Sequence, residues 1–189
     1  MTSPEFSSLK NHFLLAMPGL DDPNFSGAVI YICEHSEDGA MGLIINHPAE
    51  LTMSRVFDEF DLAYADEIGR RPLLIGGPVQ QERGFVIHRP SRHRWDSTLF
   101  VSPDVCITAS QDIIADIARQ QGPEASYITL GYAGWSPGQL EYELSANSWL
   151  ISEADPQIIF DVPFDQRMTA TADKLGIDLA RISPHAGRA

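Results

Sequence analysis

The segment that most constrains the fold is a glycine-rich stretch, residues 130–144, which lies between an apolar run and an amphipathic run. It predicts a strand that ends in a turn at residues 131–134 and continues into a helix over residues 137–146. Ser136 and Gln139 have the spacing of a capping box, and Pro137 suits the first position of a helix. Such a junction can present unpaired N–H groups to an anion, or it can be ordinary scaffolding. The sequence leaves both interpretations open.

Apolar runs separated by turn-forming residues predict a sheet that is followed by helices. Strands are expected at residues 13–17, 27–35, 40–46, 72–75, 84–88, 99–101, 105–108, 125–130 and 149–151. The second and third of these form a hairpin that closes at residues 36–39. Helical spacing predicts helices at 54–60, from 110 to a stop at 121–123, at 137–146 and at 163–175, with a turn at 179–182. Ser110 is the expected N-cap of the second helix, and residues 61–71 are an expected loop. Clustered strands with later helices favour an α+β fold.

The composition is that of a globular protein, with 43% hydrophobic and 21% charged residues in 189. This length predicts a single domain over residues 11–189, after a flexible N-terminus at residues 1–10. No apolar run approaches the roughly 18–20 residues of a membrane helix. Residues 1–9 lack a basic region before an apolar core, which argues against a secretory leader and for the cytoplasm.

A formal net charge of −13 argues against binding to nucleic acid unless a basic patch interrupts the acidic surface, and no membrane partner is expected. One basic segment departs from this acidic average, with six basic side chains within twelve residues: Arg83, His88, Arg89, Arg92, His93 and Arg94. It is either a solvated loop or a local contact for an anion or a partner. Nothing in it predicts a recognition helix, so direct DNA binding is disfavoured.

Glycine-rich turns are the first candidate ligand site. Backbone glycines at a strand end can approach a ligand closely, although the same pattern forms tight structural turns. No Lys-Ser or Lys-Thr pair follows, so the segment is not a P-loop. The two aromatic side chains can stack on a ligand or fill the core. The candidate residues are Gly76, Gly77, Pro78, Gly131, Tyr132, Gly134 and Trp135.

A second candidate is a polar cluster of Glu34, His35, Asn46 and Arg83, suited either to acid–base chemistry or to structural hydrogen bonds. On a regular strand Cys33 and His35 share a face, so the imidazole could activate the thiol. A buried, inert Cys33 is the alternative.

Zinc and redox chemistry find no support in the spacing of the remaining residues. Cys33 and Cys106 are far apart and form no C-x-x-C pair, so two reduced thiols are expected. The six histidines are scattered, and Ser110 has no G-x-S-x-G context. We expect no metal site, no cofactor and no nucleophilic serine.

Several segments together resemble one family. They are residues 13–18, 22–25, 34–35 and 39–46 in the N-terminal half and residues 76–79, 83–86, 110–112 and 130–135 in the rest. On these segments the chain resembles the YqgE/AlgH family of bacterial proteins along nearly its whole length. The resemblance implies a single compact domain, in which a mixed, barrel-like sheet is flanked by helices, in a bacterial cytoplasmic protein. One branch of the family is labelled a transcriptional regulator of alginate production, but the resemblance carries over no catalytic residue.

We therefore expect a non-catalytic regulatory or binding protein that contacts an unknown protein partner or a small anionic ligand and influences transcription indirectly. The alternative is an enzyme that acts on a small anionic or nucleotide-like substrate in a glycine-lined cleft. In that enzyme His35 or His88 would be the acid or base.

Overall fold

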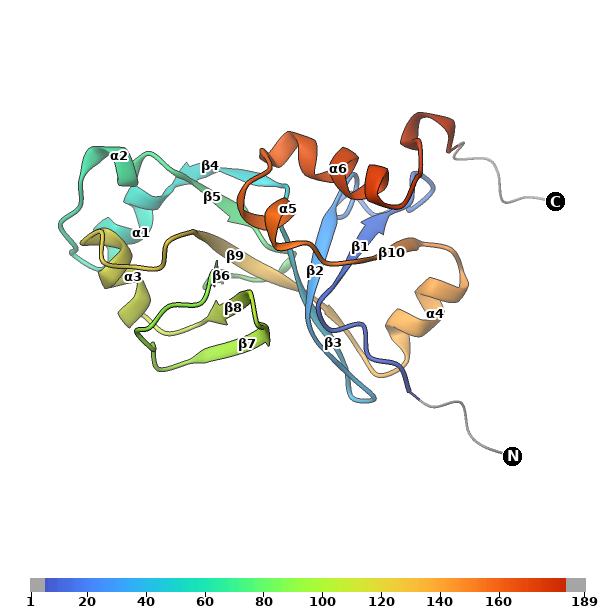
Figure 1. Ribbon diagram of the computed structural model, residues 1–189, viewed down its shortest axis with the longest axis horizontal. Coiled ribbons are helices and arrows are strands. Elements are labelled where there is room, and N and C mark those ends of the chain that lie inside the picture. The colour runs from blue at the N-terminus through green and yellow to red at the C-terminus, as the bar shows by residue number, and fades with distance from the viewer. Residues whose placement is uncertain (1–5, 183–189) are drawn as a thin grey trace. The chain divides into compact units, whose positions relative to one another are not determined.

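The computed structural model describes residues 6–182 and is shown in Figure 1. Its contacts divide the chain into two compact units: a terminal unit, residues 6–46 and 133–182, and a central unit, residues 47–132. Of the predicted flexible N-terminus, residues 1–5 lie outside the described residues. Farther along, the Ser8 hydroxyl and the Leu9 N–H both donate to His35, at 2.9 and 2.8 Å. The expectation of a single domain over residues 11–189 stays a prediction.

The terminal unit is an antiparallel sheet with helices. The strand order is β10-β1-β2-β3-β9, with bounds β1 His12–Ala16, β2 Val29–Ser36, β3 Gly39–Ile44, β9 Ser126–Trp135 and β10 Trp149–Glu153. Its helices are α4 Gln139–Ser145, α5 Pro156–Phe160 and α6 Arg167–Lys174, with 3-10 turns η1 Phe164–Gln166 and η2 Leu179–Arg181. The core includes Leu14, Ile30, Ile32, Ile44, Trp135 and Trp149.

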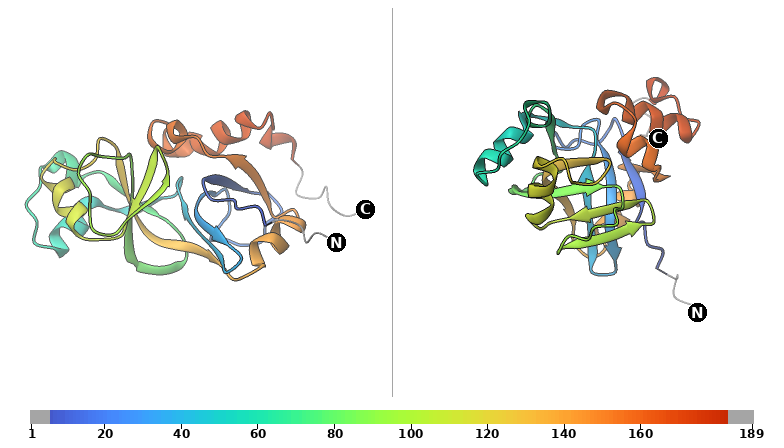
Figure 2. Two further views of the ribbon diagram at one scale, coloured as in Figure 1. Left: turned by 60° about the horizontal axis from the view of Figure 1, so that its bottom comes forward. Right: turned by 60° about the vertical axis from the view of Figure 1, so that its left-hand side comes forward.

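The central unit contains the other strands and the first part of β9. Its strands are β4 Pro48–Thr52, β5 Pro72–Ile75, β6 Val79–His88, β7 Thr98–Ser102 and β8 Val105–Thr108. β9, β6, β8 and β7 follow one another in antiparallel pairs, as Figure 2 also shows, while β5 runs parallel to β9 and pairs with β4. The helices are α1 Met53–Glu59, α2 Asp66–Gly69 and α3 Asp112–Ala118. The core includes Met53, Phe57, Leu73, Trp95, Ile113 and Ile128.

The predicted α+β class and the mixed sheet are confirmed. The predicted hairpin also forms, since β2 and β3 pair from Ile30–Ile44 to Ser36–Gly39. The strand order does not close into a barrel: it is an open path whose ends, among the described strands, are β10 and β7.

The predicted turn at residues 131–134 is wrong, because β9 continues through it to Trp135. Gly131 has a φ of +73°, and the register of β9 against β6 shifts between Val79 and Gly84. Beyond this irregularity β9 pairs with β3, so the backbone is extended and hydrogen-bonded where the glycines suggested a turn. Long-range pairing has overridden the local turn pattern.

The predicted caps are also corrected. α4 begins at Gln139 after a left-handed Gly138, and only half of the predicted capping box forms, with the Ser136 N–H donating to Gln139 Oε1 at 3.0 Å. α3 has Gln111 at its N-cap position, without a side-chain cap. Ser110 is not the cap because its hydroxyl donates to the Asp112 carboxylate.

Other differences concern short elements. α2 lies within the predicted loop, and β4, α5 and the first half of β6 were not predicted. The predicted helix at 163–175 is a 3-10 turn followed by α6.

The glycine at position 131 yields a test with an internal control. A Cβ there would meet the carbonyl oxygens of Gly77 and, at 3.0 Å, Val79, whereas at Gly138, with φ +75°, it would meet nothing within 4 Å. We expect Gly138→Ala to lower the free energy of unfolding by about 1–2 kcal/mol, the cost of a left-handed alanine. Gly131→Ala should cost about 1–3 kcal/mol more because it also overpacks the backbone. Urea denaturation measures both, and equal losses would contradict the structure.

Candidate functional site

The glycine segments predicted to form a ligand cleft meet one another backbone to backbone. The Gly76 N–H donates to the Leu130 carbonyl at 2.8 Å. A Cβ on Gly76 would touch the Gly131 carbonyl, and one on Gly131 would touch that of Gly77. The structure therefore brings Gly76, Gly77 and Gly131 together, with Pro78 exposed beside them, and the space around these glycines is occupied by the partner strand.

The rest of that predicted set lies further along β9. Half-buried Tyr132 packs edge to face against Phe85, with ring centroids 6.0 Å apart. Gly134 and Trp135 belong to the terminal unit, where Gly134 pairs with Met41. Trp135 is 6% exposed, and its indole N–H donates to Glu143 Oε2 at 2.9 Å. The same carboxylate oxygen accepts from the Trp149 indole N–H at 2.8 Å.

The predicted polar cluster is divided between the two units. In the terminal unit, His35 Nε2 lies 2.7 Å from Glu141 Oε1, and its Nδ1 accepts from the Leu9 N–H. Because Nδ1 is an acceptor, Nε2 carries the proton donated to Glu141. Asn46 bonds through both ends of its amide, with Oδ1 accepting from the Val29 N–H and Nδ2 donating to the Gly27 carbonyl, each at 2.8 Å. Exposed Glu34 lies on β2, while Arg83 lies on β6 of the central unit.

Both thiols are buried. Cys33 lies at the irregularity in the β2–β3 register, so the strict alternation assumed for Cys33 and His35 does not hold there. Burial, reinforced by the charge of Glu34, raises the pKa of Cys33 far above that of a free thiol. Burial also raises the pKa of Cys106, which is 1% exposed. Neither thiol has the low-pKa environment of a reactive cysteine.

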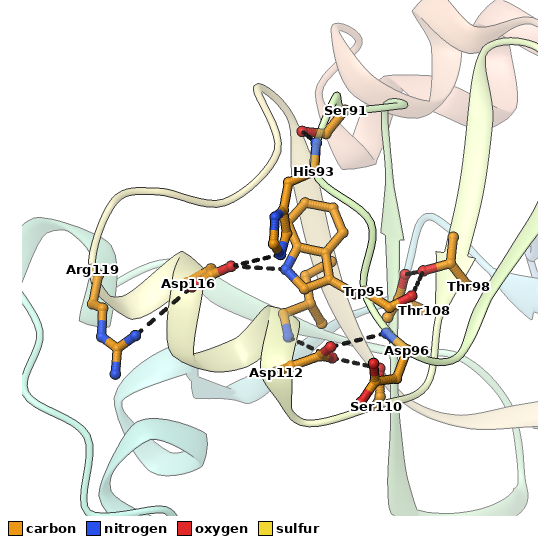
Figure 3. Close-up of polar contacts among 11 residues, drawn as sticks. Ser91, His93, Trp95, Asp96, Thr98, Thr108, Ser110, Asp112, Asp116 and Arg119 are labelled. Atoms are coloured by element: carbon orange, nitrogen blue, oxygen red, sulfur yellow. Dashed lines mark hydrogen bonds and ion pairs between the residues drawn. The ribbon is translucent and has the colours of Figure 1, made fainter.

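The basic segment is anchored by its ring side chains. Trp95 is 3% exposed and donates from Nε1 to Asp116 Oδ2 at 2.9 Å, and His93 Nε2 lies 3.7 Å from the same oxygen, as Figure 3 shows. The Arg83 guanidinium lies over the Phe85 ring, and that of Arg94 over Phe100, 5.1 and 5.9 Å from the centroids.

The Asp112 carboxylate organises the chain just before β7. It accepts from the Asp96 N–H at 2.9 Å and from the Ser110 hydroxyl, as Figure 3 shows. It also accepts from the Ile113 N–H at 3.0 Å, and the Ser110 hydroxyl oxygen itself accepts from the Ser97 N–H at 3.1 Å. Burial alone would raise the pKa of Asp112, but these hydrogen bonds together lower it. Sequence reasoning assigned Ser110 to a cap and did not identify this carboxylate as the centre of the network.

His88 is the last residue of β6 and is buried in the same unit. Its Nδ1 donates to the Arg89 carbonyl at 2.8 Å, so the neutral ring accepts at Nε2 from the Thr108 hydroxyl at 2.7 Å. The side chain is 1% exposed, and burial lowers its pKa. A buried neutral histidine with both nitrogens bonded is a structural group.

A groove in the central unit is a candidate binding site. It lies between α1, β6, the start of α3 and β9 and has a volume of about 270 Å³. Its floor is apolar and consists of Val56, Phe60, Val86, Ile114, Ile128 and Leu130. The polar residues that line it are Glu59, Glu82, Arg83, Thr108, Ser110 and Gln111. Of the residues predicted for a site, Arg83 lines this groove. Val56 and Phe60 are four residues apart, and this helical spacing predicted a helix over residues 54–60. It did not predict that both side chains line a groove.

Metal ligation finds no support in the part of the chain that the structure describes, because no three His, Cys, Asp or Glu side chains gather there. Among the same residues, no helix is long and apolar enough to cross a membrane.

The sequence matches the AlgH-like family over residues 13–180, and the chain belongs to this family. It is 52% identical over 185 residues to a UPF0301 protein of Saccharophagus degradans, covering 98% of this chain and 91% of that protein. It is 48% identical to one of Nitrosococcus oceani, covering 95% and 96%. The solution structure of the AlgH protein from Pseudomonas aeruginosa superposes with a TM-score of 0.80 at 46% identity, covering 100% of this chain and 99% of that one.

A crystal structure of a Corynebacterium diphtheriae protein shares the fold, with a TM-score of 0.69 at 20% identity over 88% of this chain and 86% of that one. The family predicted from sequence segments is therefore confirmed.

The buried His88 makes stability depend on pH. Its pKa is lowered in the folded state, so below the ordinary value of about 6.5 the unfolded chain binds a proton that the folded protein resists. The free energy of unfolding should therefore fall between pH 7 and pH 5. His88→Gln should cost about 1–2 kcal/mol at pH 7 through lost hydrogen bonds and should flatten this dependence.

The control is His93→Gln, since the His93 side chain is 63% exposed. Unfolding of the wild type and of both variants is followed in urea at each pH. An unchanged slope in His88→Gln would show that another group titrates.

Proposed function

We propose that this protein is a non-catalytic regulator of the bacterial cytoplasm and that its groove binds a small ligand with an apolar body and one anionic group. The observation that carries the proposal is the apolar floor of the groove beside the Arg83 guanidinium. An apolar cleft with few polar groups is the usual form of a small-molecule site.

The charges around the groove favour a monoanion. Among the described residues, no carboxylate pairs with Arg83, whose guanidinium rests on Phe85. Glu59 and Glu82 also line the groove and would repel a second or third negative charge. A ligand with a single carboxylate therefore fits better than a nucleotide. The volume of about 270 Å³ lies just below the range of about 300–1,000 Å³ for drug-sized ligands, which favours a short chain.

The hydrogen bonds and burial of the candidate acid–base and nucleophilic groups favour binding over catalysis. Both ring nitrogens of His35 and of His88 have hydrogen-bond partners within the protein. The two thiols are buried with raised pKa values. A regulatory role is supported by likeness to a family in which one branch is labelled a regulator, and the cytoplasm is what that likeness implies.

Octanoate tests the proposal, with octylamine as the oppositely charged control. We expect octanoate to raise the melting temperature, since a ligand that binds the folded state stabilises it by mass action, and octylamine to have no such effect. Arg83→Gln should weaken octanoate binding about tenfold, the effect of losing one charged hydrogen bond. Phe60→Ala should weaken it as well, because Phe60 forms part of the floor.

The matched control is Arg70→Gln, whose side chain is 83% exposed in the same unit and lies outside the groove. Octanoate binding that survives Arg83→Gln unchanged would contradict the proposed site. Turnover of a phosphorylated substrate, lost in Arg83→Gln, would favour an enzyme instead.

A further inference from the structure

Strand β7 has an open edge. It pairs with β8 and with no other strand among the described residues. Ser97 directly precedes β7. Its N–H donates to Ser110 Oγ at 3.1 Å and its carbonyl accepts from the Ala109 N–H at 3.0 Å, so both backbone polar groups of Ser97 point to the side of β8. Backbone groups alternate along a strand, so those of Thr98 and Phe100 face away from β8.

The side chains support this assignment of the edge. The Thr98 and Thr108 hydroxyl oxygens, on directly opposed residues, are 2.8 Å apart. Such close side chains are typical of a pair that exchanges no backbone hydrogen bonds. The outward N–H and C=O groups of Thr98 and Phe100 are therefore available to another strand.

The surface next to this edge is cationic and partly apolar. Phe100 is 48% exposed, and the Arg94 guanidinium lies 5.9 Å from its ring centroid. Arg92 is exposed as well. Residues 83–95 contain four arginines, two histidines and no acidic residue, in a chain whose net charge is −13. The exposed Glu82 and Asp96 bound this run along the chain.

The loop that carries these arginines is held in place from inside. Trp95 and His93 both face Asp116, as Figure 3 shows, with the indole N–H bonded at 2.9 Å. The intervening Arg94 and the preceding Arg92 are left on the surface. Because the loop is held at Trp95 and His93, less backbone entropy is lost when the two guanidinium groups bind carboxylates.

We propose that the open edge of β7 binds an acidic, extended segment of a partner protein as an added strand, with Arg92 and Arg94 holding its carboxylates and Phe100 packing against an apolar side chain. Strand addition is a recurring form of peptide recognition. A peptide supplies both the donors and the acceptors that the edge requires. A phosphodiester backbone has no N–H donor for the outward carbonyls, and a long polyanion is repelled by the net charge of this chain.

A fluorescent peptide of alternating valine and glutamate, about eight residues long, is the probe. Fluorescence anisotropy should show binding that weakens with salt, and a peptide of alternating valine and lysine should not bind. The same acidic peptide, N-methylated at alternate residues, should bind about tenfold more weakly, because it has lost backbone donors. Equal binding of the two acidic peptides would overturn strand addition.

The double variant Arg92→Gln and Arg94→Gln should weaken binding of the acidic peptide about tenfold or more. Phe100→Ala should weaken it further, while Arg70→Gln should leave it unchanged. Because all these side chains are exposed, the variants should keep the wild-type melting temperature, which checks that they fold.

Two further outcomes would overturn the proposal. Tighter binding of oligothymidylate than of the peptide would make the surface a nucleic-acid site. Concentration-dependent self-association, lost in the double variant and seen by sedimentation, would make a second copy the occupant. Octanoate binding should persist in the double variant, so a failure here is distinguishable from a failure of the groove.

Discussion

The conformation of β9 at Gly131 is the constraint on which much of the structure depends. Ile128 and Leu130, both even-numbered, pack in the core of the central unit, whereas the odd-numbered Ala133 and Trp135 pack in the core of the terminal unit. Gly131 lies between these two groups, and there β9 departs from regular strand geometry: its φ is +73°, and residues 79–84 of β6 lie opposite only residues 130–132 of β9. A Cβ at this position would meet the Gly77 carbonyl, so glycine is required at this point of the strand.

Local patterns predicted the elements whose formation is decided locally. The hairpin of β2 and β3 follows from an apolar, β-branched strand and a polar turn that ends in glycine, all within about twenty residues. The continuation of β9 through Gly131 and Gly134 depends instead on pairing with strands that lie distant in sequence. β4, with the sequence Pro-Ala-Glu-Leu-Thr, has no clear apolar alternation, and it exists because β5 pairs with it. Propensity gives little information where long-range pairing decides.

Of the residues predicted for a site, only Arg83 lines the groove, and its predicted partners lie elsewhere. Arg83 was chosen as a cation and grouped with His35 and Asn46, yet these lie in different units. Spacing along a sequence does not reveal which distant strands become neighbours. Two segments that carried the family resemblance, residues 83–86 and 110–112, both contribute to the groove. These segments carried the family resemblance, but the sequence did not show that they lie beside one another.

The groove and the β7 edge share one hydrogen-bond network, and this limits what each can do. The Ser110 hydroxyl lines the groove but already donates to Asp112 and accepts from the Ser97 N–H, next to β7. The Thr108 hydroxyl, which also lines the groove, is bonded to His88. A ligand that took either hydroxyl would leave a partner unsatisfied, at a cost comparable to the bond it gained. The polar ends of Arg83 and Gln111, which also line the groove, have no hydrogen bond or ion pair within the described residues. Under the proposed function, these two side chains are therefore the ones that would contact the polar group of a ligand.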